Sequence, residues 1–465
     1  MPSSKKKNTT LHSEVINARE AAVGVLQEVE EKEAYINLIL NRTISKLSLS
    51  NTERSLLTEL SYGVISRLNT LDWILSLSLN RPLEKMTIPI RNILRMGTYQ
   101  LIFLDRIPDS AAVDESVKLA YRFGHKGVAG LVNAVLRKVI EIKEDLPWPL
   151  KSESPDLFLS LRYSYPLWMV QRWIDNFGFE EAEAFCSAGN LAPPLTVRAN
   201  TLRISRSELK RVLASEGVEA EDCAYAPEGL KLKLSNKLIE LESFREGLFQ
   251  VQGESSMLAA PLLNPQPGET VLDLCSAPGG KTVHLGILMQ NQGEIAACDL
   301  YPHRLRLVQD AARRQGIQII NIEKIDGRSI PSHKDGTFQR VLIDVPCSGL
   351  GVIRRKGDLK WRRQPQDIKS LSHLQMELLQ GAFRALSPGG VLLYSACTVE
   401  PEETTDVIEK FLESEPSARP AMLSPLLPEE LKPEEKKEGM LFLWPHKQNL
   451  DGFFLAKIRK KPSVN

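Results

Sequence analysis

From Gly268 onward, short apolar runs alternate with amphipathic stretches of helical length. The apolar runs predict buried strands at 270–274, 294–299, 340–344 and 390–395. The stretches between the first three runs predict helices at 281–289 and 302–315. Strands that alternate with helices need crossover connections, so we expect a doubly wound, mostly parallel α/β sheet. Ligands of such sheets bind at the carboxyl ends of the strands, and the residues there are the first candidates for a functional site.

The chain before this region has two other patterns. Residues 12–145 carry apolar residues at helical spacing and almost no alternating pattern, which predicts an all-α bundle of about seven helices. Prolines at 147 and 149 end that pattern. Residues 150–265 mix candidate strands at 196–200 and 230–234 with a helix at 205–216 and predict a small α+β module. The expected fold class is therefore multidomain, with a Rossmann-like α/β domain at 266–462.

Composition excludes several classes of protein. Lys and Arg number 59 against 58 for Asp and Glu, so any nucleic-acid binding must come from local basic patches. No apolar run is long enough to span a bilayer, and the six cysteines include no C-x-x-C pair. We expect a cytoplasmic protein with reduced thiols, no metal and no membrane contact. Residues 1–11 predict a solvated basic tail, and the Glu- and Pro-rich stretch 413–438 predicts a mobile surface insertion.

The loop after the first predicted strand reads Asp273-Leu-Cys-Ser-Ala-Pro-Gly-Gly-Lys-Thr282 and leads into a helix. It lacks the G-x-G-x-x-G of a dinucleotide fold, and Cys275 stands where a P-loop has its first glycine. S-adenosylmethionine fits better, because its amino-acid part suits a loop backbone and its ribose needs an acidic partner. Asp299 ends the second strand about 20 residues on, as a ribose-binding acid would. A purely structural role stays open for each acid. Asp299 caps the next helix in one alternative, and Asp326 is a turn residue rather than a contact to adenine in the other.

Two cysteines follow predicted strand ends: Cys347 in Asp344-Val-Pro-Cys-Ser-Gly and Cys397 in Tyr394-Ser-Ala-Cys-Thr. Both would leave the sheet at its ligand edge, together with the carboxyl group of Asp344. Two thiols and a carboxyl group beside a methyl donor suit methylation of a pyrimidine. A thiolate that adds to carbon-6 of cytosine makes carbon-5 nucleophilic, and an acid near N3 stabilises the adduct, a role for Asp344. The residues alone do not show which cysteine attacks.

In combination and in order, these motifs resemble those of the NOL/NOP2/Sun family of RNA cytosine-C5 methyltransferases. The resemblance implies that Cys397 is the nucleophile and that Cys347 aids release of the product. It implies S-adenosyl-L-methionine as cofactor, bound by Cys275, Ser276, Ala277, Pro278, Gly279, Gly280, Lys281, Asp299, Asp326 and Asp344. Two departures stand beside the nucleophile: Ala396 where threonine is usual, and Thr404 where asparagine is usual. Both bear on rate or fine geometry more than on the type of reaction.

The helical front resembles the NusB-like RNA-binding domain in stretches such as Glu59-Leu-Ser-Tyr-Gly-Val64 and Leu94-Arg-Met-Gly-Thr-Tyr-Gln-Leu101. Fused to this methyltransferase, it implies a target cytosine in small-subunit ribosomal RNA, free or in an early assembly particle, and a monomeric enzyme. A basic cluster surrounds Trp361 after the third strand and predicts contact with phosphates and an unstacked base. Its members are Arg354, Arg355, Lys356, Lys360, Arg362 and Arg363.

Other functions compete with this hypothesis. The same chemistry on transfer RNA or large-subunit RNA uses the same motif residues. A non-catalytic RNA-binding or transcription factor would have no reason to retain Cys397, Asp344 and the Gly279-Gly280 pair. A nucleotide hydrolase built on Gly280-Lys281-Thr282 would lack the first glycine of its loop.

Overall fold

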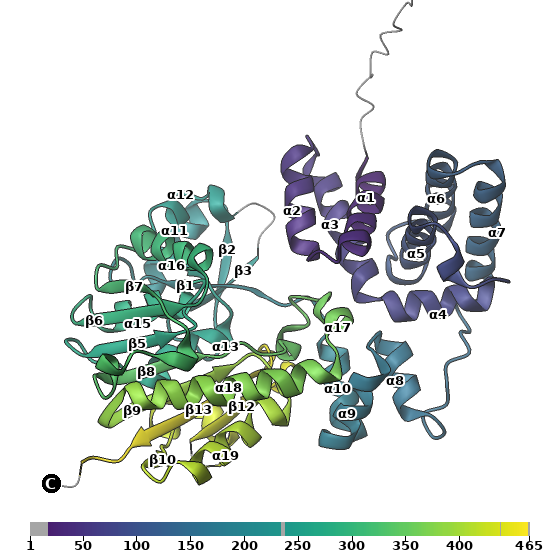
Figure 1. The fold of residues 1–465 in the computed structure, drawn as a ribbon. Coiled ribbons are helices and arrows are strands. Elements are labelled where there is room, and N and C mark those ends of the chain that lie inside the picture. The colour runs from purple at the N-terminus through teal and green to yellow at the C-terminus, as the bar shows by residue number, and fades with distance from the viewer. Residues whose placement is uncertain (1–16, 234–237, 438, 464–465) are drawn as a thin grey trace, which may run out of the picture. The chain divides into compact units, whose positions relative to one another are not determined.

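A computed structural model describes residues 17–233, 238–437 and 439–463. The predicted basic tail at 1–11 lies outside the described residues. The chain divides into two compact units, residues 1–186 and 187–465 (Figure 1). The domain limits expected from the sequence stay predictions, since the division between the units falls inside the expected α+β module.

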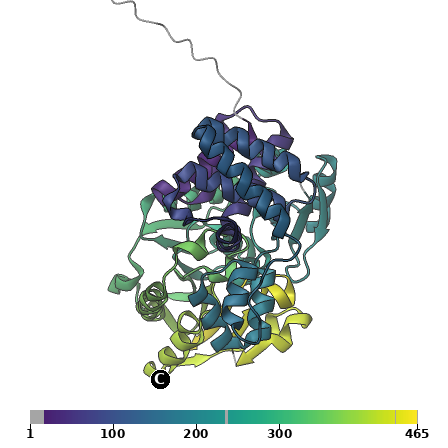
Figure 2. The ribbon, with the colours of Figure 1, turned by 90° about the vertical axis from the view of Figure 1, so that its right-hand side faces the viewer.

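The first unit is helical, and the described residues from 17 to 142 include no strand (Figure 2). Its first seven helices are α1 (Ala18–Lys32), α2 (Ile36–Lys46), α3 (Asn51–Ser66), α4 (Leu68–Ser78), α5 (Ile88–Phe103), α6 (Asp109–Phe123) and α7 (Lys126–Ile142), with a 3-10 turn η1 (Leu83–Lys85). Helix α5 packs against α1, α3, α4, α6 and α7. It is buried on most of its surface, including Ile93, Leu94 and Met96, because it lies at the centre of the bundle. The predicted all-α bundle is confirmed.

Three more helices follow the proline break: α8 (Pro155–Tyr163), α9 (Leu167–Phe177) and α10 (Phe179–Ala188). Helix α8 packs on α4, where the Asn69 side chain donates to the Ser160 hydroxyl at 2.9 Å. The buried Trp173 of α9 meets Tyr165 and Phe185 edge-on. These contacts join most of this helical segment to the first unit.

A small antiparallel sheet opens the second unit, with strand order β2-β3-β1-β4. Its elements are β1 (Leu195–Ala199), α11 (Arg206–Ser215), β2 (Glu219–Asp222), β3 (Gly229–Lys233), η2 (Leu238–Glu240), α12 (Glu242–Arg245) and β4 (Phe249–Val251). Ser205 caps α11 and forms a capping box with Glu208, as the predicted helix at 205–216 requires. The sequence predicted β1 and β3. It missed β2, in which Ala220 is the one apolar residue, and β4, which has only three residues.

The large sheet has the order β11-β12-β13-β9-β8-β5-β6-β7, and β10 pairs with β13. Its strands are β5 (Thr270–Leu274), β6 (Glu294–Asp299), β7 (Ile320–Lys324), β8 (Phe338–Asp344), β9 (Leu386–Ala396), β10 (Ala418–Pro420), β11 (Glu435–Lys437), β12 (Met440–Leu443) and β13 (Phe453–Lys460). The neighbours from β9 to β7 are parallel, whereas β13 joins β9 in antiparallel fashion. The predicted parallel sheet is confirmed, and the antiparallel extension was not foreseen.

Helices cover both faces of this sheet (Figure 1). The helices of this region are α13 (Glu254–Met257), α14 (Ala259–Leu263), α15 (Gly280–Leu288), α16 (Pro302–Gln315), α17 (Leu359–Arg362), α18 (Pro365–Ala385), α19 (Thr405–Ser414) and α20 (Pro445–Gln448). Of these, α14, α15, α16, α18 and α19 contact strands of the sheet. On strand β5, Leu272 packs in the core with α18 and α19, whereas its neighbour Val271 packs in the core with α14 and α15. Alternate side chains of a strand point to opposite faces, so a strand buried on both sides is apolar throughout.

The stretch 413–438 is not the mobile surface insertion that its composition predicted. The described part forms β10, β11 and two 3-10 turns, η7 (Ser424–Leu426) and η8 (Glu429–Glu434). Leu423, Leu427 and Leu431 are buried in the core beneath the sheet. The prediction was wrong because prolines and glutamates outnumber the apolar residues that anchor the segment, namely these three leucines and the buried Ala418 of β10. Among the described residues, no helix is long and apolar enough to cross a membrane.

Candidate active site

The predicted site residues gather where parallel strands end. Asp299 ends β6 and Asp344 ends β8, while the cofactor loop follows β5 and Cys397 follows β9 directly. Strands β8 and β9 are neighbours, with Asp344 opposite Ser395 in the register. The carboxyl ends of neighbouring parallel strands meet at one sheet edge, so residues far apart in the sequence come together there.

The two cysteine sulfurs lie 3.2 Å apart, within hydrogen-bond reach. The contact stabilises a thiolate on Cys397, so it lowers the pKa of Cys397 and raises that of Cys347. The surroundings of Cys397 act in both directions: burial and the negative charge of Asp344 raise its pKa, but the net shift is downward. Positive charges on Lys281 and Lys356 further lower the pKa of Cys397, whereas the negative charge of Glu403 further raises that of Cys347. Cys397 is therefore the better nucleophile of the pair.

Lys281 joins the cofactor loop to this thiol pair. Its ammonium nitrogen lies 2.6 Å from Asp344 Oδ2, and its side chain is only 11% exposed. The Ser395 hydroxyl donates to the other carboxylate oxygen, Oδ1, at 2.7 Å. The ammonium also lies 5.2 Å from the ring centre of Phe453. Asp344 is thus a fixed carboxylate beside the thiols, held from two directions.

The cofactor loop, Cys275 to Gly280, links β5 to α15 and bends back on itself. The amide of Ser276 donates to the Cys298 carbonyl at 2.9 Å, and that of Gly279 to the Ser276 carbonyl at 2.8 Å. Gly279 has φ +99°, and a Cβ there would lie 2.8 Å from Val308 Cα. Only glycine combines this backbone conformation with so close an approach. Burial raises the pKa of the Cys275 thiol, so Cys275 is a poor nucleophile.

Three buried polar atoms around this loop accept no hydrogen bond from the described residues: Asp273 Oδ1, Ser276 Oγ and Asp299 Oδ2. Burial of unpaired polar atoms is costly, so such atoms mark places where a ligand group binds. The residues therefore fit a ligand with an amino group and hydroxyls. Sequence reasoning missed Asp273, whose pKa is raised by burial to about 7. Its signal was present, because an acid inside a buried apolar strand is unusual.

Two acids serve local turns, although Asp299 does not cap α16 as one alternative held, because the N-cap residue of that helix is Tyr301. Asp299 Oδ1 accepts the Tyr301 amide at 3.0 Å, just before α16, so one carboxylate oxygen serves the turn while Oδ2 makes no hydrogen bond and lies 3.5 Å from Arg304. Asp326 begins the 3-10 turn η3 (Gly327–Ser329) and is held by the Arg328 guanidinium at 2.7 Å. Both oxygens of Asp326 are engaged, so a role in cofactor binding stays a prediction for this residue.

The basic cluster around Trp361 mostly has partners inside the protein. Arg354 and Arg355 both pair with the buried Asp451, at 2.7 Å and 2.6 Å. Arg363 donates to the Ser348 carbonyl at 2.7 Å, and Lys360 is 1% exposed. The prediction that the cluster as a whole contacts RNA phosphates therefore needs correction for these four side chains. Lys356 is the exposed member.

Asp451 ties the C-terminal strand region to the loop after the first cysteine. Beyond the two arginine pairs, the Gly452 amide donates to the Gly351 carbonyl at 2.8 Å, and the Gly351 amide donates to the Cys397 carbonyl at 3.1 Å. The chain of contacts runs from Asp451-Gly452 to the backbone of Cys397. Sequence reasoning did not assign this role, because its partners lie about a hundred positions apart.

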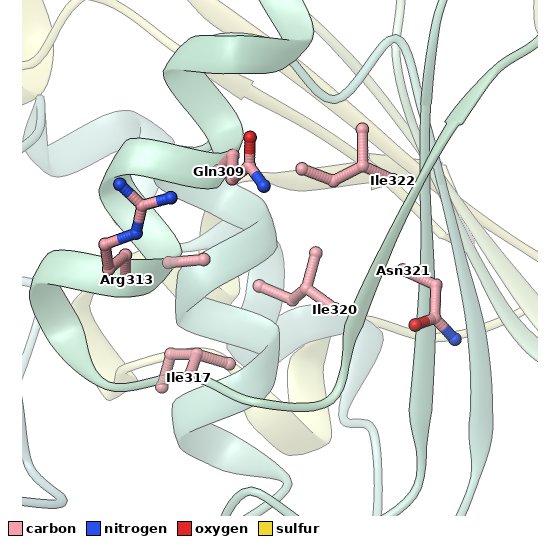
Figure 3. A pocket seen from close by; sticks show the side chains of 7 residues that line it. Gln309, Arg313, Ile317, Ile320, Asn321 and Ile322 are labelled. Carbon is pink, nitrogen blue, oxygen red and sulfur yellow. The ribbon is translucent and has the colours of Figure 1, made fainter.

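A surface pocket lies elsewhere in the second unit, between α16 and β7 (Figure 3). Gln309 and Arg313 of the helix face Ile320 and Ile322 of the strand. None of the predicted site residues lines it. The candidate site is therefore defined by the gathering of strand-end groups rather than by this hollow. Within the described residues, no cluster of His, Cys, Asp and Glu is arranged to hold a metal.

The fold and site define a Rossmann-like methyltransferase preceded by a helical domain. Three family models match in chain order: the NusB family at 16–141, a ferredoxin-like domain of RsmF/B-like methyltransferases at 165–238, and the 16S rRNA methyltransferase RsmB/F at 260–459. The probable ribosomal RNA small subunit methyltransferase B of Bacillus subtilis is 38% identical over 96% of this chain and 99% of its own length. The chain belongs to the RsmB/F family of 16S rRNA methyltransferases.

Solved structures agree with this placement. The crystal structure of PH0851 superposes with a TM-score of 0.79 at 27% identity and covers 95% of this chain and 98% of its own. A methyltransferase homologue from Pyrococcus horikoshii is 33% identical with a TM-score of 0.56, over 66% of this chain and 99% of its own. The similarity thus extends from the helical unit through the methyltransferase domain, and the predicted fold class is confirmed.

Proposed function

We propose that this protein transfers a methyl group from S-adenosyl-L-methionine to carbon-5 of a cytosine in small-subunit ribosomal RNA. One observation carries the proposal: two cysteine sulfurs 3.2 Å apart at the strand edge that also holds the Lys281–Asp344 pair. Methylation of cytosine at carbon-5 needs these functional groups, a nucleophilic thiolate and a carboxyl group held next to it. Methyl transfer to oxygen or nitrogen would need no thiol.

Cys397 acts as the nucleophile in this proposal. Its thiolate adds to carbon-6 of the cytosine, and electron density moves toward carbon-5 and N3. Asp344, fixed by Lys281 and Ser395, enters this step as the carboxylic acid: it gives its proton to N3 as the carbon–sulfur bond forms and takes it back when that bond breaks. After carbon-5 has gained its methyl group, it loses its proton to a water molecule and the Cys397 thiolate departs, which restores the aromatic ring. Cys347, in contact with the Cys397 sulfur, aids this release.

The cofactor would be held by the loop Cys275–Gly280 and the acids around it. S-adenosyl-L-methionine supplies the methyl group as an electrophile. Asp273 Oδ1 and Ser276 Oγ, both buried without a hydrogen-bond partner among the described residues, suit its amino-acid part. Asp299 Oδ2, which also accepts no hydrogen bond among the described residues and lies 3.5 Å from Arg304, suits its ribose hydroxyls. Lys281 contributes from the first turn of α15, and Asp326 from the turn after β7.

The target must leave its stack to reach Cys397, so we propose an RNA loop or a flipped base as substrate. The name of the Bacillus subtilis relative supports small-subunit ribosomal RNA, free or in an early assembly particle, over transfer RNA and large-subunit RNA. We propose that the protein acts as a monomer in the cytoplasm. All six cysteines are free in the structure, as a reducing compartment requires.

The test is methyl transfer from labelled S-adenosyl-L-methionine to three unmodified RNAs in parallel: small-subunit, large-subunit and transfer RNA. We expect labelled 5-methylcytosine in the small-subunit RNA alone, identified by nucleoside analysis. Label in transfer RNA alone would overturn the substrate, and label on another atom of the base would overturn the reaction. The same RNA inside purified small-subunit precursor particles shows whether a particle is the true substrate.

A further inference from the structure

Glu403 is a buried carboxylate that touches both cysteine loops. It is 0% exposed. Its Oε1 accepts the Ser348 amide at 2.7 Å and the Gln375 side-chain amide at 3.0 Å. Its Oε2 accepts the Thr398 hydroxyl at 3.0 Å. Ser348 and Thr398 are the residues directly after Cys347 and Cys397, so one side chain links the two loops.

The two hydroxyls complete a closed network. Ser348 Oγ lies 2.9 Å from Thr398 Oγ1, and both side chains are fully buried. The Tyr394 hydroxyl of β9 donates to the Glu403 backbone carbonyl at 2.8 Å, which fixes the carboxylate relative to the strand that presents Cys397. Each loop can shift only if a hydrogen bond to Glu403 breaks.

A buried carboxylate is a costly choice for a purely structural role. Its side-chain hydrogen-bond partners among the described residues are all neutral, and burial raises its pKa. A hydrophobic residue, or a neutral amide with its own partners, would hold a loop with less desolvation. What a carboxylate offers is two strong acceptor oxygens in one rigid plane, one for each loop.

We propose that Glu403 is a positioning residue that sets the separation of the Cys347 and Cys397 sulfurs. Its role in catalysis rests on the proposed function, whereas its effect on the thiols can be measured without RNA or S-adenosyl-L-methionine. Glu403 touches neither substrate nor thiol in this proposal. It acts through Ser348 and Thr398.

Phenylarsine oxide measures the separation, because its arsenic bonds two nearby thiols at once and releases one water molecule. The full-length protein is titrated as wild type, Glu403→Gln and Thr398→Val. Glu413→Gln serves as the matched control, because it removes the same charge from an exposed position on α19. Thermal unfolding of each variant shows whether it is folded.

We expect wild type and Glu413→Gln to bind one equivalent, and Glu403→Gln and Thr398→Val to bind about tenfold more weakly, the effect of one lost hydrogen bond. We also expect the midpoint pH for alkylation of Cys397 to rise in both variants, because the contact with Cys347 is weakened. A residue that only stabilised the fold would lower the unfolding temperature and leave both thiol readouts unchanged. That outcome would overturn the proposal.

Thr398→Val keeps the proposal testable if Glu403→Gln does not fold, because it removes one hydroxyl and leaves the carboxylate with its other partners. The methyl-transfer assay tests the proposed function separately from the positioning role of Glu403. Wild-type protein without cytosine methylation contradicts the proposed function, whatever the arsenic result. Normal thiol spacing in folded Glu403→Gln and Thr398→Val contradicts only the positioning role of Glu403 and leaves the proposed function unaffected.

Discussion

The Lys281 ammonium lies 2.6 Å from the Asp344 carboxylate and joins the loop after β5 to the end of β8. The two charges act on the Cys397 thiol in opposite directions: Lys281 lowers its pKa and Asp344 raises it. The pair therefore exerts opposite effects on the pKa of Cys397, and the ammonium of Lys281 also holds the Asp344 carboxylate in place. Its two members can be removed one at a time.

Lys281→Met should raise the pKa of Cys397, and Asp344→Asn should lower it. The pH dependence of Cys397 alkylation, followed by mass spectrometry of its peptide, measures both shifts without any substrate. Methyl transfer should nevertheless fall in both variants, by about 10²–10⁴-fold for the loss of a group that handles a proton. Shifts of the same sign in the two variants would contradict the arrangement.

Cys397→Ala should abolish turnover, by about a thousandfold or more, because no other group replaces the nucleophile. Binding of S-adenosyl-L-methionine should survive, since the orphaned polar atoms that suit it belong to Asp273, Ser276 and Asp299. Calorimetry and the methyl-transfer assay measure the two properties separately. Cys223→Ala is the matched control, a buried cysteine of the small module, and it should remain active. An active Cys397→Ala protein would refute the assignment of the nucleophile.

Cys347→Ala should behave differently from Cys397→Ala. The nucleophile remains and attacks, but release of the methylated base slows, so a covalent protein–RNA adduct accumulates. Loss of the Cys347 thiol also raises the pKa of Cys397, because their contact is the largest cause of its lowering. A denaturing gel with labelled RNA detects the adduct as a shifted band. If the band fails to appear while turnover is lost, Cys347 has another task, such as activation of the nucleophile.

The sequence predicted the parts of this protein that local pattern controls. Runs such as 295–298 are apolar because the middle of β6 is buried on both faces, and the strand ends then placed Asp299, Asp344 and Cys397 at one edge. The sequence did not reveal pairings between distant charged groups. Nothing local marks Asp451 as the partner of Arg354 and Arg355, so a cluster that is largely internal resembled an RNA-binding surface.

For the stretch 413–438, the sequence did contain a signal of burial, but its composition outweighed that signal. Leu423, Leu427 and Leu431 are spaced four apart, and all three are buried, yet the surrounding prolines and glutamates suggested mobility. Glu403 precedes Thr404 directly and carries no signal of its own in the sequence. Its role depends on two loops that meet only in the folded sheet. Thr404, a departure from the family pattern, donates its hydroxyl to the Glu400 carbonyl at 2.8 Å and so has a local structural use.

Gly351→Ala should disturb the contact that ties the C-terminal strand region to the nucleophile. A Cβ at Gly351 would lie 2.1 Å from the Gly452 carbonyl oxygen, and the clash is with backbone that cannot rotate away. We expect a loss of about 1–3 kcal/mol in stability together with reduced methyl transfer. Gly130→Ala is the control, because nothing lies within 4 Å of a Cβ there, and helix propensity should make it neutral or slightly stabilising. Chemical denaturation compares the two, and equal effects would contradict the close approach.

Acid should destabilise the protein through His284. This histidine is buried, and its Nε2 lies 2.9 Å from Glu228 Oε1. Burial, with help from the charge of Arg198, lowers the pKa of His284 to about 4, and Glu228 only partly opposes this. Because the unfolded chain takes up the proton near pH 6.5 and the folded protein does not, stability is full above that pH.

As the pH falls from 6.5 toward 4, the unfolded state gains a proton that the folded state still refuses, so the free energy of unfolding decreases, by on the order of 3 kcal/mol from this group. His284→Gln keeps a donor for Glu228 and cannot titrate. Urea unfolding at pH 7.5 and pH 5 should therefore show a smaller acid loss in His284→Gln than in the wild type. An equal loss in both proteins would mean that His284 is protonated as readily in the folded protein as in the unfolded chain.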